Sequence, residues 1–209
     1  LLVINVGSGV KALAFFTDPA TGAPRLACGT SIDYGESGDV RIFDPVAGGE
    51  ALVKVGGKPK MSKWAALKAK SKMLIGFGVK SKAAALVIDV GSKVLALAVF
   101  ADPATGELRI ACGCGDRKLN IGDVRLFDPV AGGEALVVLE GHTYSVRALT
   151  VFEDRATGGL RLASGSDDNS VRIWDLAAGG AALFVLEGHT SYVFALTAFA
   201  DLARGETRL

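Results

Sequence analysis

The chain has 209 residues and half of them are apolar, which is enough to bury a core and excludes disorder as its main state. Its 23 basic and 22 acidic residues give a net charge of +1, so the chain as a whole lacks the basic surplus of a nucleic-acid-binding domain. Three cysteines are too few for a disulfide framework, which predicts a reducing compartment, the cytoplasm, with the nucleus as the alternative.

The first fifty residues of the chain return later in the sequence. The motifs LVINVGSGV, RLACG and GDVRIFDPVAGGEALV recur 84 residues further on as LVIDVGSKV, RIACG and GDVRLFDPVAGGEALV. A shorter repeat follows, because LEGHT begins at Leu139 and again at Leu186, 47 residues later. Periods of this size indicate repeated supersecondary units. We expect one domain, residues 1–209, with units at 1–50, 51–83 (degenerate), 84–134, 135–181 and 182–209 (incomplete).

An apolar run at residues 83–101 is long enough to be compared with a membrane-spanning segment. Asp89, Gly91, Ser92 and Lys93 stand at its centre. A charge is costly there, and a turn would leave backbone groups without hydrogen-bond partners in lipid. We therefore expect two strands joined by a turn, and no membrane span.

The unit at residues 135–181 shows the expected elements most clearly. Short aliphatic or β-branched runs alternate with turn-forming residues, and these runs cover residues 136–141, 146–152, 160–164 and 171–175. The turns between them include Asp154 to Gly159 and Asp167-Asp168-Asn169. The pattern predicts four strands joined by hairpins, with no helix.

Two motifs of this unit are typical of one family. Gly141-His142 is followed by Trp174-Asp175, and LASGSDDNSVRIWD leads into the second pair. These residues resemble the WD-repeat β-propellers, strongly over residues 137–190, moderately in the copies ending RIFDP and RLFDP, and weakly over residues 54–82. In the two moderate copies Phe43 and Phe127 replace the tryptophan.

The resemblance implies an all-β fold, a β-propeller made of four-stranded antiparallel blades, with about four to five blades present in this chain. Propellers have four to eight blades, and the family usually has seven. We therefore expect a partial ring: the chain is part of a larger propeller in a longer polypeptide, or a second copy completes the ring.

The resemblance also implies a structural tetrad, a hydrogen-bonded chain formed by His142, Ser164, Asp168 and Trp174. Such a chain satisfies buried polar groups and ties the loop before one strand to the neighbouring strand pair. A Ser/His/Asp hydrolase site is the alternative, but Ser164 is expected in the middle of a strand and the sequence has no GxSxG motif. We expect no catalytic residue, no metal ligand and no cofactor.

Propellers bind partners through the loops at the ends of their blades, because their strands are committed to packing. Tyrosine and arginine often dominate the energy of such interfaces. The candidate partner-binding residues are Tyr144, Arg147, Asp167, Asp116, Arg117, Lys118, Tyr192 and Phe194. We expect a non-catalytic protein–protein interaction scaffold that binds other proteins within a larger complex. The alternative is a regulatory or sensor propeller of a larger enzyme or NTPase switch.

The stretch from Ala51 to Ile88 carries nine lysines and no acidic residue. It can be interpreted as the solvated face of a degenerate blade, as a basic amphipathic helix, or as a patch for an acidic partner. The candidate basic patch consists of Lys58, Lys60, Lys63, Lys68, Lys70 and Lys72. It gives a further alternative function, an adaptor for nucleic acid or an anionic surface, with protein favoured over nucleic acid.

Overall fold

A computed structural model of the chain describes residues 4, 6, 9–31, 38–46, 53–55, 90, 92–115, 122–201 and 203–209. All the regular secondary structure in these ranges is β-strand, so the predicted all-β fold is confirmed. Among the residues described, no helix has the length and apolar character needed to cross a membrane.

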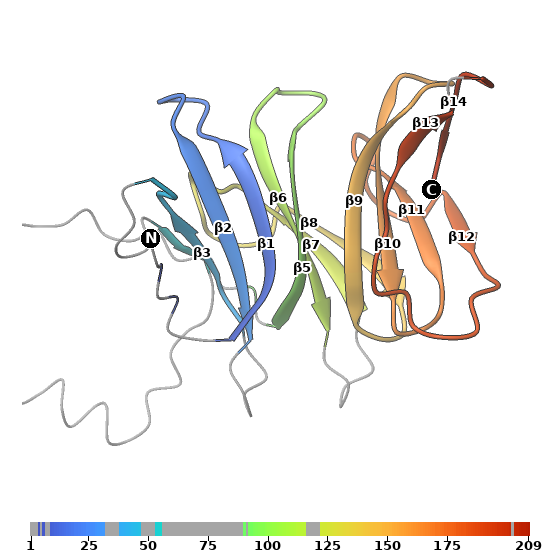
Figure 1. Cartoon of the computed structure of the whole chain (residues 1–209), viewed down its shortest axis with the longest axis horizontal. Helices are drawn as coiled ribbons and strands as arrows, with labels where there is room; N and C mark the ends of the chain where they lie inside the picture. The colour runs from blue at the N-terminus through green and yellow to red at the C-terminus, as the bar shows by residue number, and fades with distance from the viewer. Residues whose placement is uncertain are drawn as a thin grey trace, which may run out of the picture.

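Four antiparallel sheets follow one another along the described chain, three with four strands and one with two (Figure 1). The first contains β1 (Gly9–Thr17), β2 (Pro24–Ser31), β3 (Val40–Phe43) and β4 (Val53–Val55). The second contains β5 (Lys93–Ala101), β6 (Leu108–Gly115), β7 (Gly122–Phe127) and β8 (Val137–His142). The third contains β9 (Val146–Asp154), β10 (Gly159–Ser166), β11 (Val171–Asp175) and β12 (Phe184–Leu186). The last pairs β13 (Phe199–Asp201) with β14 (Glu206–Arg208).

The sheets are offset by one strand from the units of the sequence. The first apolar run of the unit 135–181 is β8, and β8 pairs with β7 of the preceding sheet, whereas β9 pairs with β10. The loop between His142 and Val146 therefore crosses from one blade to the next. Each repeat of the sequence thus ties two neighbouring blades together covalently.

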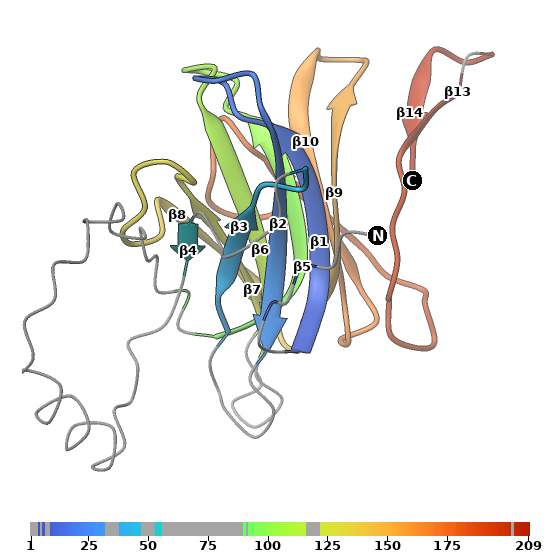
Figure 2. The same ribbon diagram turned by 60° about the vertical axis from the view of Figure 1, so that its left-hand side comes forward.

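The sheets pack face to face through a contact that recurs at each blade boundary. A glycine on the second strand of one sheet receives a valine from the segment that follows, on the first strand of the next sheet in two cases and before β13 in the third. A methyl group placed on Gly29, Gly113 or Gly165 would lie 2.8, 2.9 or 2.6 Å from the valine Cγ1. The three valines are Val94, Val146 and Val193. Successive blades are thus held side by side, as in a partial β-propeller (Figure 2).

The first and second sheets are direct neighbours. Ala27 and Ile42 of the first sheet share one buried cluster with Val94 and Ile110 of the second. In the sequence, however, Val94 follows Phe43 by 51 residues, whereas Val146 follows Phe127 by only 19. Most of the unit predicted at residues 51–83 lies outside the described residues, and its described part, β4, completes the first sheet. The two sheets are in direct contact, and residues 56–89, which lie between them in the sequence, are outside the described residues.

The first sheet leaves one apolar face uncovered among the described residues. Leu13 and Phe15 on β1 are 58% and 69% exposed. Leu97 and Val99, the residues 84 positions later, pack against the cluster between the first two sheets. The exposed pair therefore occupies the position at which a preceding blade would pack.

The close approach at the glycines gives a testable prediction. We expect Gly113→Ala to lower the free energy of unfolding by about 1–3 kcal/mol, because the new methyl group overpacks the contact with Val146. Gly9→Ala is the matched control, since a methyl group at Gly9 has nothing closer than 3.5 Å, and we expect a change within about 0.5 kcal/mol. Urea unfolding of the two variants measures the difference. Equal midpoints for both variants would contradict close packing at Gly113.

Candidate functional site: a buried polar network and a blade-end surface

Four polar side chains from different parts of the third unit meet in the core. His142 ends β8, Ser164 lies within β10, Trp174 lies on β11, and Asp168 lies in the turn between β10 and β11. His142 Nε2 is 2.8 Å from Ser164 Oγ, and His142 Nδ1 is 2.8 Å from Asp168 Oδ2. Trp174 Nε1 donates to Ser164 Oγ at 2.8 Å. The structure therefore brings together all four residues of the tetrad implied by the sequence.

The hydrogen-bond partners of each atom show which groups in the network donate a proton and which accept one. Asp168 Oδ2 also accepts from the backbone N–H of Thr143, at 3.1 Å, so it is an acceptor for His142 Nδ1–H. The hydroxyl of Ser164 accepts from Trp174 and donates to His142 Nε2. Burial lowers the pKa of His142 below its ordinary value, although the hydrogen bond and the charge of Asp168 act in the opposite direction. The ring is therefore neutral in the folded protein, with its proton on Nδ1.

The order of serine, histidine and aspartate is that of a nucleophilic triad, yet the surroundings are those of a core. Ser164 has no exposed surface, and the histidine side chain is 1% exposed. A nucleophilic serine must instead face a cleft with hydrogen-bond donors for the developing oxyanion. Ser164 Oγ is also occupied by the indole N–H of Trp174. These hydrogen-bonded residues stabilise the blade, and Ser164 is not accessible to a substrate.

Two further serines complete the network, and reasoning from the sequence missed them. Ser170 Oγ donates to Asp168 Oδ1 at 2.7 Å, and its backbone N–H donates to the same oxygen at 2.9 Å. Ser166 Oγ donates to the carbonyl of Tyr144 at 2.9 Å and accepts from the backbone N–H of Asp168 at 3.1 Å. These bonds fix the turn between β10 and β11, in which Asn169 has a φ of 66°. The signal in the sequence is the short segment SDDNS, whose polar side chains favour bonds to their own turn.

In the first two sheets, apolar or weakly polar residues replace both central members of the network. Cys28 and Cys112 pair with Arg41 and Arg125 across the sheet, as Ser164 pairs with Arg172. Phe43 and Phe127 likewise take the place of Trp174. The indole donor and the hydroxyl acceptor are thus lost together, so neither is left buried without a partner. Burial raises the pKa of both thiols, which makes them small neutral core residues.

The predicted partner-binding residues that the structure describes fall into two groups. Arg147 and Asp167 bind each other through two short bonds, Nε to Oδ1 at 2.9 Å and Nη2 to Oδ2 at 2.7 Å. Tyr144, Tyr192 and Phe194 instead expose 42%, 47% and 63% of their surface. The rings of Tyr192 and Phe194 meet edge to face with centroids 5.9 Å apart. The three aromatic side chains are therefore the exposed members of the set, whereas Arg147 and Asp167 pair with each other.

Backbone hydrogen bonds join the loops that carry these aromatic residues. The N–H of Asp167 donates to the carbonyl of Ser145, and the N–H of Val193 donates to the carbonyl of Ser166. The loop before β9, the turn after β10 and the segment at residues 191–194 are therefore adjacent at one end of the blades. We call Tyr144, Tyr192 and Phe194 the blade-end surface.

Several predicted site residues lie outside the described residues. Three of them are the loop candidates Asp116, Arg117 and Lys118, and the others form the basic patch Lys58, Lys60, Lys63, Lys68, Lys70 and Lys72. Within the described part of the chain, no cluster of three or more histidine, cysteine, aspartate or glutamate residues could hold a metal ion.

Comparison with known proteins agrees with the geometry of the third unit. Residues 133–175 match the family described as WD domain, G-beta repeat, and this range contains the whole tetrad. The segment is similar to a WD repeat. No curated protein matches the chain.

A solved structure resembles the fold over more of the chain than this one segment. It is a chain of a humanized mutant of the Chaetomium thermophilum Polycomb Repressive Complex 2 bound to the inhibitor GSK126. The similarity has a TM-score of 0.57 at 16% sequence identity and covers 96% of the present chain. The present chain spans 37% of the length of that neighbour, and at this identity the likeness concerns the fold alone.

The centre of the network gives the second prediction. We expect Ser164→Ala to lower the free energy of unfolding by about 1–3 kcal/mol, because it leaves the indole N–H of Trp174 and Nε2 of His142 without a partner. Ser191→Ala, at an exposed position, should change stability by no more than about 0.5 kcal/mol. Chemical denaturation followed by tryptophan fluorescence measures both. A Ser164→Ala protein as stable as the control would show that the network does not brace the blade.

The lowered pKa of His142 gives the third prediction. Between pH 6.5 and the lower pKa of the folded state, the unfolded chain binds more protons on this ring than the folded chain does, so acid favours unfolding. We expect the free energy of unfolding to fall as the pH decreases from 6.5, by up to about 1.4 kcal/mol per pH unit.

The control for this pH dependence is His142→Gln, compared with the wild-type chain by urea unfolding between about pH 5 and 7.5. The variant keeps a side chain that forms hydrogen bonds and removes the titrating group. The wild-type slope should exceed the variant slope in this range. Identical slopes would show that a group other than His142 causes the pH dependence of stability.

Proposed function

We propose that this chain is a non-catalytic scaffold that binds other proteins through the blade-end surface. The WD repeat at residues 133–175 supports this proposal, because such repeats are typically interaction domains. The neighbouring solved chain belongs to a multisubunit assembly, which is the kind of setting in which a scaffold of this fold acts. The proposal also includes the reducing compartment, cytoplasm or nucleus, expected from the cysteine content.

The observation that carries this proposal is the exposure of three aromatic side chains at one blade end. Tyr192 and Phe194 keep large rings in solvent although each lies one residue from Val193, which is 7% exposed. Aromatic residues contribute large contact areas at a low cost in side-chain entropy, and they recur at the centres of interfaces. The buried tetrad and the Arg147–Asp167 pair fix the loops beneath them. A fixed loop loses little entropy when a partner binds.

The fourth prediction tests this surface. We expect Tyr192→Ser combined with Phe194→Ser to weaken binding of the native partner at least about tenfold, because two exposed aromatic rings are lost. The matched control is Val130→Ser, which removes a 70% exposed apolar side chain at the opposite end of the blades. Quantitative affinity capture from cell extract identifies the partner, and titration of that purified partner gives the dissociation constants. A partner lost with Val130→Ser and kept by the double variant would overturn the proposed surface.

A further inference from the structure

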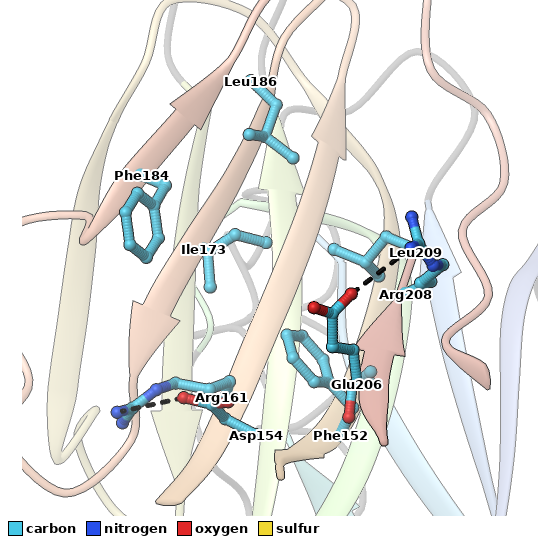
Figure 3. Close-up of a pocket in the computed structure, with 10 residues that line it drawn as sticks. Phe152, Asp154, Arg161, Ile173, Phe184, Leu186, Glu206, Arg208 and Leu209 are labelled. Atoms are coloured by element: carbon cyan, nitrogen blue, oxygen red, sulfur yellow. Dashed lines mark hydrogen bonds and ion pairs between the residues drawn. The ribbon is translucent and has the colours of Figure 1, made fainter. Parts of the chain in front are cut away.

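Three arginines lie on strands of the third sheet, and two of them are paired with carboxylates. Arg147 on β9 binds Asp167 through two short bonds. Arg161 on β10 pairs with Asp154, as Figure 3 shows. Arg172 on β11 differs, because its guanidinium forms no hydrogen bond and no ion pair with any residue that the structure describes. Its Nε is nevertheless buried.

The first two sheets show how an arginine at this position is normally held. Arg41 and Arg125 occupy the position of Arg172 in the repeat. Nε and Nη2 of Arg41 lie 3.0 and 2.9 Å from Asp39 Oδ2. The same two nitrogens of Arg125 lie 2.9 and 2.7 Å from Asp123 Oδ2. In both sheets the two nitrogens therefore hold one carboxylate oxygen, from the residue two positions earlier in the chain.

The third sheet has a serine in place of this aspartate. Ser170 stands two positions before Arg172, and its hydroxyl and its N–H both donate to Asp168 Oδ1. The other oxygen of Asp168 accepts from His142 and from the N–H of Thr143. The nearest carboxylate in the sequence is thus committed to the polar network. Arg172 has lost the partner that its two counterparts keep.

Arg172 lies at the boundary between the second and third sheets, both of which have four strands here. A β-carbon placed on Gly141, in β8 of the second sheet, would be 2.7 Å from Nη1 and 3.2 Å from Cζ of Arg172. The missing side chain of this glycine leaves room for the guanidinium against β8. Within its own sheet Arg172 is paired with Val185 of β12, which is 44% exposed. An unpaired cation and an exposed apolar side chain therefore lie next to each other at this boundary.

The unpaired guanidinium points to an anionic ligand. A guanidinium keeps its charge in proteins, and a buried N–H of a charged group without a hydrogen bond costs free energy. The nearby acidic residues on the outer strands, Glu140 and Glu187, are exposed, and neither pairs with Arg172. The chain itself places a carboxylate at the two equivalent positions. A carboxylate is therefore the ligand whose geometry fits Arg172.

We propose that Arg172 binds the carboxylate of an aspartate or glutamate side chain from a partner protein, at the boundary between the second and third sheets. Nε and Nη2 of Arg172 hold one carboxylate oxygen in the way that Arg125 holds Asp123. The methylene groups of the bound side chain pack on Val185. The proposal rests on the scaffold function only in that the ligand belongs to a protein. It involves no residue of the blade-end surface.

The Nε–Hε signals of the arginines in the ¹⁵N-labelled full chain test this proposal by nuclear magnetic resonance. The probes are aspartate and asparagine, each acetylated at its amino group and amidated at its α-carboxyl group. We expect the aspartate probe to shift the Arg172 signal saturably and to bind at least about tenfold more tightly than the asparagine probe. The signal of Arg125, whose nitrogens already hold Asp123, is the internal control and should not shift.

Variants locate the contact, with the backbone amide signal of Val185 as the readout. Arg172→Gln removes the charge and should reduce the affinity for the aspartate probe to that for the asparagine probe. Arg172→Lys keeps the charge but loses the paired nitrogens, so we expect at least about fivefold weaker binding. Arg155→Gln, in the exposed turn after β9, is the matched control and should bind like the wild-type chain.

Four outcomes would overturn the proposal. The first is an Arg172 signal that the aspartate probe does not shift, and the second is equal affinity for the two probes. The third is tighter binding of inorganic phosphate than of the aspartate probe, which would assign the site to a phosphate ligand. The fourth is an Arg172 signal that shifts in Glu140→Gln or Glu187→Gln, which would show an ion pair within the chain. None of these titrations depends on Tyr192 or Phe194, so their failure would leave the test of the blade-end surface unaffected.

Discussion

The contact between a glycine on one sheet and a valine on the next is the constraint on which the remaining structure depends. Gly29, Gly113 and Gly165 leave room for a branched side chain that a β-carbon would displace. Two sheets can then approach closely enough for the larger apolar residues around them to form continuous clusters. A four-stranded sheet with two apolar faces is not stable alone in water, so each blade owes its stability to its neighbours.

The polar network acts on one end of this packed array and the arginine clamps act on the other. These clamps are the ion pairs of Arg25, Arg109 and Arg161, on the second strand of each four-stranded sheet, with aspartates at the ends of both neighbouring strands. The network of His142 and Asp168 lies where the chain crosses from β8 to β9, at the end that carries the blade-end surface. The clamp of Arg161 lies at the other end, where the hairpins turn. Both devices join strands that the backbone alone would connect only through a flexible loop. The first two blades keep the clamp and give up the central members of the network, and there cysteine and phenylalanine maintain the packing.

Local pattern in the sequence was sufficient to predict the strands of the unit 135–181, whereas the members of the tetrad came from the resemblance to WD repeats. The run at residues 171–175 is β11 to the residue, because a regular alternation ends there at a turn-forming segment. The assignment of strands to sheets was not predictable in the same way. Whether β8 pairs with β7 or β9 depends on long-range packing, and the periodicity of the repeat is the same in either case.

Other features depended on comparing blades in space. The 84-residue period suggested two units, and the direct packing of Val94 against the first sheet could not be inferred from that period. The arginine of RLACG and RIACG was visible in each repeat, but nothing local in the sequence indicates that its partners come from strands on both sides.

The face of β1, which is uncovered among the described residues, limits the symmetry of a contact made through it. Leu13 and Phe15 present the kind of surface that, one blade further along, fits against the back of its neighbour. Because the front and the back of a blade are different surfaces, two copies joined front to back would be arranged head to tail and would not be related by a twofold axis. The turn per blade then decides the outcome: a rotation that divides the circle evenly gives a closed assembly, and any other rotation gives an open helical filament.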